Sequence, residues 1–140
     1  MAVFHSLTAR QQNYLTTHYP NQDFSKFIAC GGTRMVFEYD DKHVIKYATD
    51  SYQNKEEWDK TQAVVGTAYE SRIFRIVKHA PDFLWVVQEK AFGTFEDDPL
   101  YHALYPEIRE VAPHVNVYDV QDHNIGKRED GSWAFIDLGL

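Results

Sequence analysis

The sequence predicts a single α+β domain, in which strands joined by tight turns come before a helix and short strands return near the C-terminus. Two turn sequences, Gly31-Gly32 and Asp40-Asp41, separate β-branched and aromatic stretches in the first half. Apolar residues over 99–111 recur at helical spacing. No strand–helix–strand unit repeats, so an α+β order is favoured over a parallel α/β sheet.

The first half is expected to form a helix, a meander of three strands and a second helix. Ser6 is a candidate cap for the first helix, which Pro20 ends, and Ser51 or Asn54 is a candidate cap for the second. The expected ranges are a helix over 7–18, strands over 24–29, 34–39 and 43–48, and a helix over 54–65.

The second half is expected to hold strands on both sides of one amphipathic helix. Leu100, Leu104 and Ile108 fall on one face of that helix, and 129–132 is a turn sequence. The expected ranges are strands over 73–77 and 84–88, a helix over 99–111, and strands over 115–118, 125–127 and 133–136.

Composition excludes several functional classes. The 140 residues carry 14 Lys and Arg against 21 Asp and Glu, a net charge of −7 that repels phosphate backbones, so we expect no nucleic-acid partner. No apolar run reaches the roughly 20 residues of a membrane span, and the first ten residues lack the apolar core of a signal peptide. The single Cys30 fits a reducing cytoplasm. We therefore expect a cytoplasmic protein that has no membrane association.

Polar residues gather after two short apolar stretches near the C-terminus. Asp119 and Asn124 follow one, and Asp137 follows the other. Carboxylate and carboxamide oxygens are the ligands that hard cations such as Mg²⁺ prefer. Turn chemistry is the alternative interpretation of these residues, because Asp and Asn favour loops.

The spacing of these residues matches a set of known motifs. Asp119 and Asn124 are five residues apart, as in the kinase D-x-x-x-x-N catalytic loop, and Asp137-Leu138-Gly139 is similar to D-F-G. Upstream, 43–46 (His-Val-Ile-Lys) resembles V-A-I-K on the expected third strand, Gly31-Gly32 lies in the preceding hairpin, and 86–89 precedes an adenine-contacting hinge.

With these motifs in order, the chain resembles the protein-kinase-like superfamily, in particular small kinase-like proteins of bacteriophages. The resemblance implies an N-lobe over about 24–91, an antiparallel sheet with one main helix, and a strongly reduced C-lobe over 92–140 that ends at the D-F-G-like motif. It also implies ATP and Mg²⁺ as ligands, and the host cytoplasm as the location if the chain is phage-encoded.

The resemblance assigns nucleotide contacts to the first half of the chain. Lys46 would hold the α- and β-phosphates, and Glu57 on the following helix would pair with it, Glu56 and Glu70 being the alternatives. Gly31, Gly32 and Arg34 would lie at the phosphates, and Glu89 at the adenine hinge.

In the second half, Asp119 would orient or deprotonate the acceptor hydroxyl, and Asn124 and Asp137 would hold Mg²⁺. The chain departs from the family pattern at Arg34, which stands at the third glycine of the phosphate loop, and at Val117, which replaces the catalytic-loop histidine. No activation loop or substrate platform follows 137–139. A partner protein or a second copy in a homodimer is expected to supply that surface.

The leading functional hypothesis is phosphotransfer from Mg-ATP to a protein Ser/Thr hydroxyl. The alternative is a non-catalytic kinase-like module, a pseudokinase, that binds and inhibits a host protein. A small-molecule phosphotransferase and a metal-dependent hydrolase using Asp119, Asp122, His123 and Asp137 also remain open.

Overall fold

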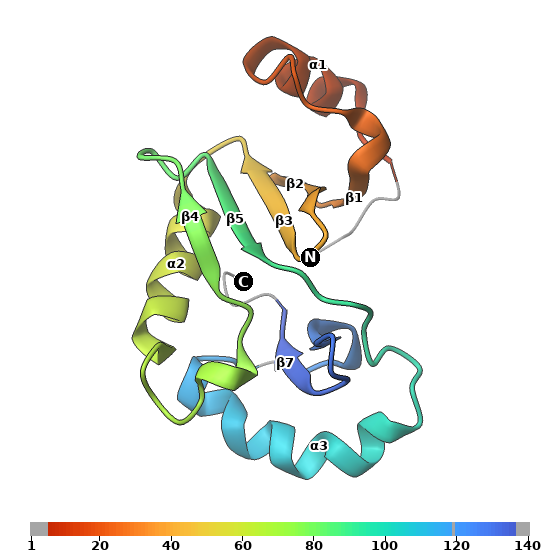
Figure 1. The fold of residues 1–140 in the computed structure, drawn as a ribbon, viewed down its shortest axis with the longest axis vertical. Helices are drawn as coiled ribbons and strands as arrows, with labels where there is room; N and C mark the ends of the chain where they lie inside the picture. The colour runs from red at the N-terminus through yellow and green to blue at the C-terminus, as the bar shows by residue number, and fades with distance from the viewer. Residues whose placement is uncertain (1–5, 119, 137–140) are drawn as a thin grey trace.

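The computed structural model describes residues 6–118 and 120–136, which form three α-helices, a five-stranded antiparallel sheet and a two-stranded hairpin (Figure 1). This confirms the predicted α+β class. The helices are α1 (Ala9–His18), α2 (Tyr52–Val64) and α3 (Leu100–Val111), and the strands are β1 (Phe27–Cys30), β2 (Arg34–Asp40), β3 (His43–Ala48), β4 (Ile76–His79), β5 (Trp85–Glu89), β6 (Ile125–Lys127) and β7 (Trp133–Phe135). None of the helices in the described ranges is both long and apolar enough to cross a bilayer.

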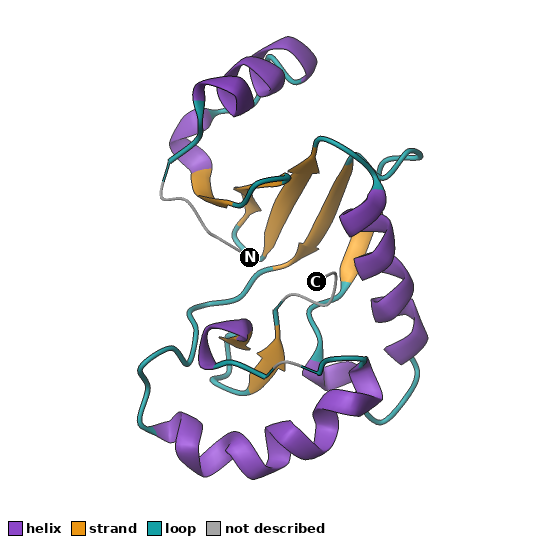
Figure 2. Cartoon of the chain, turned by 180° about the vertical axis from the view of Figure 1, so that it is seen from behind, coloured by secondary structure: helices purple, strands orange, loops and turns teal. Residues whose placement is uncertain are grey.

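The large sheet has the strand order β1-β2-β3-β5-β4, and every neighbouring pair is antiparallel. Its central strand is β3, in which Lys46 lies opposite Val36 of β2 on one side and Val86 of β5 on the other. Helix α2 connects β3 to β4 and crosses in front of β4 when the molecule is seen from behind (Figure 2). A side chain from the middle of β3 can therefore meet a side chain from α2.

Helix α1 packs against the face of the sheet opposite α2. Its buried Leu15 joins an apolar cluster with sheet residues Cys30, Met35, Phe37, Ile45, Tyr47 and Val87. The helix begins at Ala9, not at residue 7, because Thr8 rather than Ser6 forms the N-cap in a capping box with Gln11. Gln11 is also buried and donates from Nε2 to the Gly31 carbonyl at 2.8 Å, which fixes α1 to the β1–β2 turn.

A second apolar cluster joins the end of α2 to α3 and to the β6–β7 hairpin. It contains Val64, Ile73, Phe95, Ile108, Val111, Ala112, Val115, Ile125, Trp133 and Phe135. The predicted apolar face of α3 is thus mostly covered by the chain itself, and Leu100 at its first turn stays 61% exposed. Arg72 reinforces the contact, donating to the Trp133 carbonyl at 3.1 Å and lying 2.7 Å from Glu107.

Three predicted strands differ from the structure by more than one residue at an end. The range 24–29 begins as a 3-10 turn, because Asp23 caps Phe24–Lys26 through the Ser25 amide, and the strand starts at Phe27. The range 73–77 is shifted, with β4 starting at Ile76 and Ile73 forming a single bridge to Phe135.

The range 115–118 is not a strand. Ala112–Val115 form a 3-10 turn that starts next to Pro113, and Asn116 ends it with a left-handed φ of 60°. Asn tolerates this conformation better than most residues do, which explains why the extended pattern breaks at that position. Val117 then packs against the second apolar cluster.

Close packing at Gly126 provides a test of the β6 placement. A Cβ on Gly126 would lie 2.7 Å from Ile136 Cγ1 and 2.9 Å from Phe74 Cε2. Overpacking of this kind costs about 1–3 kcal/mol, so Gly126→Ala is expected to lower the free energy of unfolding by that amount in urea denaturation. Gly32→Ala is the control, because a Cβ there meets nothing within 4 Å. Equal stability of the two variants would contradict the described packing.

Candidate functional site

The predicted contact between Lys46 and Glu57 is present in the interior. Lys46 Nζ donates to Glu57 Oε1 at 3.2 Å, and the two residues are 5% and 0% exposed. Of the three glutamates considered, only Glu57 faces β3. Glu56 lies 3.3 Å from Lys60 on the same helix, and Glu70 lies 3.8 Å from Arg75. The choice of Glu57 as the partner of Lys46 is therefore confirmed.

Arg34 contacts the same carboxylate from the neighbouring strand. Its Nη1 donates to Glu57 Oε1 at 2.9 Å, and the residue is 3% exposed. Arg34 is the first residue of β2, and β2–β3 pairing places it opposite Ala48, two residues beyond Lys46. Because residues two apart share a face of a strand, both cations point toward α2. The guanidinium of Arg34 thus lies against α2. The hairpin turn precedes Arg34 in the sequence.

Asn54 links this ion pair to the surrounding backbone. It is fully buried one helical turn before Glu57, and its Nδ2 donates to the Phe83 carbonyl at 2.9 Å and to the Lys46 carbonyl at 3.4 Å. Its Oδ1 accepts from Arg34 Nη1 at 3.4 Å. We call Arg34, Lys46, Asn54 and Glu57 the ion cluster. It joins β2, β3, α2 and the β4–β5 turn.

Burying the charged groups of the ion cluster costs free energy of folding. Removing charged groups from water carries a desolvation penalty that ion pairing often fails to recover. Apolar residues of similar size in the same place would often stabilise the core at least equally well. Buried charges in a fold are therefore candidates either for fixing the arrangement of elements or for binding chemistry. The ion cluster is a candidate for both roles, since it lies where two strands, a helix and a turn meet.

The hairpin turn before Arg34 is held from both sides. The buried Gly31 accepts from Gln11 of α1 through its carbonyl and donates to the Arg34 carbonyl at 2.9 Å. On the other side, Thr33 Oγ1 hydrogen bonds to Gln53 Oε1 of α2. Gly32 at the tip is exposed, and a Cβ added there would meet nothing within 4 Å. The turn predicted to cover phosphates is thus fixed at its base and open at its tip.

Two further predicted residues, Glu89 and Asn124, lie where the large sheet leads into the C-terminal part. Glu89 ends β5, and its side chain accepts from the Arg75 amide at 2.7 Å and lies 3.8 Å from Arg128. Asn124 is half-buried, and its carbonyl accepts from the amide of Ile136 at 2.9 Å. Asp119 and Asp137 lie outside the described residues. Ile136 directly precedes Asp137 in the sequence, so the Asn124 backbone contacts the end of the segment that leads to it.

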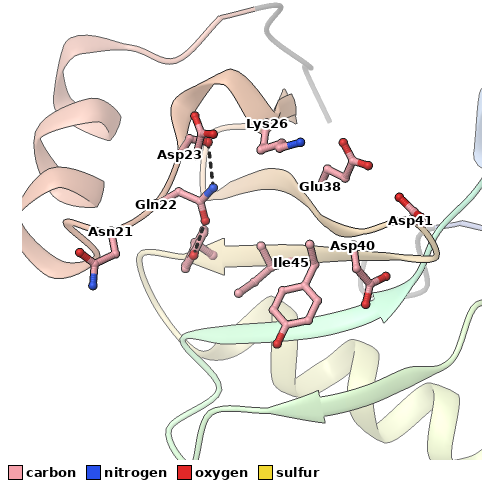
Figure 3. A pocket seen from close by; sticks show the side chains of 10 residues that line it. Asn21, Gln22, Asp23, Lys26, Glu38, Asp40, Asp41 and Ile45 are labelled. Carbon is pink, nitrogen blue, oxygen red and sulfur yellow. Dashed lines mark hydrogen bonds between the residues drawn. The ribbon is translucent and has the colours of Figure 1, made fainter.

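A surface pocket of about 320 Å³ lies apart from the ion cluster, and none of the predicted site residues that the structure describes lines it (Figure 3). Asp23, Asp40 and Asp41 are among its carboxylates. A hydrogen bond from the Ser25 hydroxyl lowers the pKa of Asp23, and one from the Lys42 amide lowers the pKa of Asp40. Both carboxylates therefore stabilise local turns.

Comparisons with known protein families and with curated proteins found no match to this chain. The arrangement of its own residues is thus the basis for a functional conclusion.

Two contributors to the site were missed in the sequence. Asn54 was considered as a helix cap, yet it lies inside α2, which begins at Tyr52. Its separation of three residues from Glu57 places both on one helix face, a signal that would have indicated a shared environment. Gln11 lies 20 residues from Gly31, and no local pattern connects them.

Glu57 and Glu56 form a matched pair for testing the ion cluster. Glu57→Gln leaves two buried cations without the carboxylate that both contact, and loss of one partner of a buried pair typically costs about 3–5 kcal/mol. Glu56→Gln removes a partly exposed pair on the same helix, worth about 0–1 kcal/mol. Chemical denaturation of both variants measures the difference. Similar losses would show that Glu57 does not balance buried charge.

Proposed function

We propose that this protein is kinase-like, binds Mg-ATP next to the ion cluster and transfers a phosphoryl group to a protein Ser/Thr hydroxyl. The contact between Lys46 on β3 and Glu57 on α2 carries the proposal. Protein kinases use a lysine of the third strand paired with a glutamate of the helix that follows it. The chain has that residue pair on those two elements, in that order.

The sheet is compatible with the small lobe of a kinase. It is antiparallel and five-stranded, and α2 lies between its third and fourth strands in the sequence. The glycine-containing turn at 31–33 precedes Lys46 in the adjoining hairpin. Its open tip at Gly32 leaves backbone accessible for a phosphate, while Gln11 and Thr33 fix its base.

The donor set fits a nucleotide phosphate. Lys46 would engage the α- and β-phosphates as a flexible point charge. Phosphoryl transfer places negative charge on several oxygens at once, so catalysis depends mainly on fixed cations and on alignment. The chain past Glu89 turns from the sheet to the second hairpin, with the Phe92 amide donating to the Lys127 carbonyl at 2.8 Å. This connecting segment is assigned to the adenine.

Asn124 and Asp137 are assigned to Mg²⁺, which prefers such oxygen ligands and supplies charge neutralisation at the phosphates when bound. Asp119 is assigned to orient or deprotonate the attacking hydroxyl. The acceptor surface is assigned to a partner protein or to a second copy of this chain. The non-catalytic alternative keeps the same fold and partner surface and lacks the transfer step.

Nucleotide binding is the first expected result. A ligand at 100 times its Kd adds about 2.7 kcal/mol to the stability of the folded state, so Mg-ATP should raise the melting temperature of the wild-type protein. Lys46→Met should remove this increase because the phosphate-binding charge is lost. Lys55→Met is the control, since Lys55 is an exposed residue that pairs with Asp59. An unchanged Mg-ATP response in Lys46→Met would contradict the site.

Transfer chemistry is tested separately through Asp119. A group that acts on the hydroxyl contributes to the chemical step more than to ground-state affinity. Asp119→Asn should therefore abolish phosphate labelling of protein while keeping Mg-ATP binding. Labelling is measured with γ-labelled ATP on the purified protein and in cell lysate. A wild-type protein that binds Mg-ATP and labels nothing would favour the non-catalytic alternative.

A further inference from the structure

We propose that Gln11 is a positioning residue for the nucleotide, which holds the peptide between Gly31 and Gly32 so that the Gly32 amide donates to a phosphate. The inference rests on the proposed function and deepens it, because the phosphate turn gains a backbone donor of fixed direction. Gln11 itself does not touch the ligand in this account and acts through the Gly31 carbonyl.

The carboxamide of Gln11 is held at both ends, so its orientation is fixed. Its Oε1 accepts from the Thr8 amide at 3.0 Å, which completes the capping box of α1. Its Nε2 donates to the Gly31 carbonyl at 2.8 Å. A reversed carboxamide would face donor with donor at Thr8 and acceptor with acceptor at Gly31. Gln11 is 6% exposed, and a hydrogen bond is stronger in such low-dielectric surroundings than in water.

Peptide geometry then fixes the direction of the next amide. A trans peptide is planar, so the Gly31 carbonyl and the Gly32 amide point in opposite directions. The Gly31 carbonyl points to α1, and the Gly32 amide therefore points away from α1. Helix α1 packs on the sheet face opposite α2, whereas Lys46 contacts Glu57 of α2. The Gly32 amide is thus directed away from the face that α1 covers and toward the face on which Lys46 lies.

The hydrogen bonds that close the turn leave the Gly32 amide to an anion. The Gly31 amide donates to the Arg34 carbonyl at 2.9 Å. The Thr49 amide donates to the Thr33 carbonyl at 3.1 Å. Within the part of the chain that the structure describes, none of the backbone hydrogen bonds of this turn uses the Gly32 amide. Backbone amides in turns bind anions, and their hydrogen bonds to charged oxygens are stronger than those to neutral ones.

Two consecutive glycines make the direction of this peptide easy to reverse. Gly32 does not have a left-handed φ, and a flip of the peptide that precedes it would give it one. Glycine adopts a positive φ without a steric penalty, so the sequence alone does not prevent the flip. The flipped peptide would turn the Gly31 carbonyl oxygen toward a phosphate and repel it. The hydrogen bond from Gln11 selects the orientation that attracts the anion.

The first experiment compares the Kd of Mg-ATP and of adenosine by titration of folded variants. Gln11→Met removes the donor to Gly31 and should weaken Mg-ATP binding by about tenfold, because the Gly32 donor to a charged group is no longer held in place. Adenosine has no phosphate, so its Kd should not change. Thr8→Ala is the matched control, since it also removes one hydrogen bond of the capping box and keeps the donor to Gly31.

A purely structural role of Gln11 predicts a different result in the same experiment. Loss of packing or of the helix cap would weaken Mg-ATP and adenosine binding equally, and it would affect Thr8→Ala as much as Gln11→Met. Either of these results would overturn the inference.

A double-mutant cycle with Gly32 tests whether the direction of the peptide is the cause. A Cβ on Gly32 meets nothing within 4 Å, so Gly32→Ala fits the present conformation, and it disfavours the positive φ of the flipped peptide. In the Gly32→Ala background, Gln11→Met should therefore weaken Mg-ATP binding by a smaller factor than it does in the wild-type background. Equal factors in the two backgrounds would overturn the inference.

Nuclear magnetic resonance of the wild-type protein tests the backbone donor directly, and it applies even if Gln11→Met does not fold. The Gly32 amide proton should shift downfield on titration with Mg-ATP and with tripolyphosphate alone. Saturation with Mg-ATP that leaves this proton unshifted would overturn the inference and not the proposed function. A protein that shows the shift with tripolyphosphate and does not bind Mg-ATP would overturn the proposed function and support the backbone donor.

Discussion

The carboxylate of Glu57 is the point on which the arrangement of the sheet and α2 depends. It is buried, and it accepts from Arg34 of β2 and Lys46 of β3. A buried charge is tolerated only where its partners are held in place, so this interaction constrains two strands and one helix together. The apolar clusters on either side stabilise the fold, and the polar contacts between them determine how α2 is oriented.

Asn54 extends the same constraint to the edge of the sheet. It binds the carbonyl of Phe83, which has a positive φ of 59° in the turn between β4 and β5. A left-handed conformation is unfavourable for an aromatic residue and persists where surrounding contacts stabilise it. The turn, the helix and the two cations are therefore connected through Asn54.

Sequence patterns predicted the elements of this unit better than its contacts. Turn residues and β-branched runs located β2, β3 and β5 closely. The order of motifs predicted a glutamate partner for Lys46, and the choice among Glu56, Glu57 and Glu70 was settled only by the structure. Arg34 was expected at the phosphates. Its contact with Glu57 was not predicted, because the direction of its side chain depends on the β2–β3 register and not on local sequence. The strand predicted over 115–118 was wrong for a similar reason. Its apolar residues pack on α3 and the β6–β7 hairpin and do not pair with another strand.

The central claim is that Lys46, paired with Glu57, binds a phosphate of the nucleotide. A crystal structure with Mg²⁺ and a non-hydrolysable ATP analogue tests it most directly. The expected result is Lys46 Nζ within hydrogen-bond distance of a phosphate oxygen and still paired with Glu57. Nucleotide bound elsewhere on the chain, or a phosphate that Lys46 does not contact, would contradict the account.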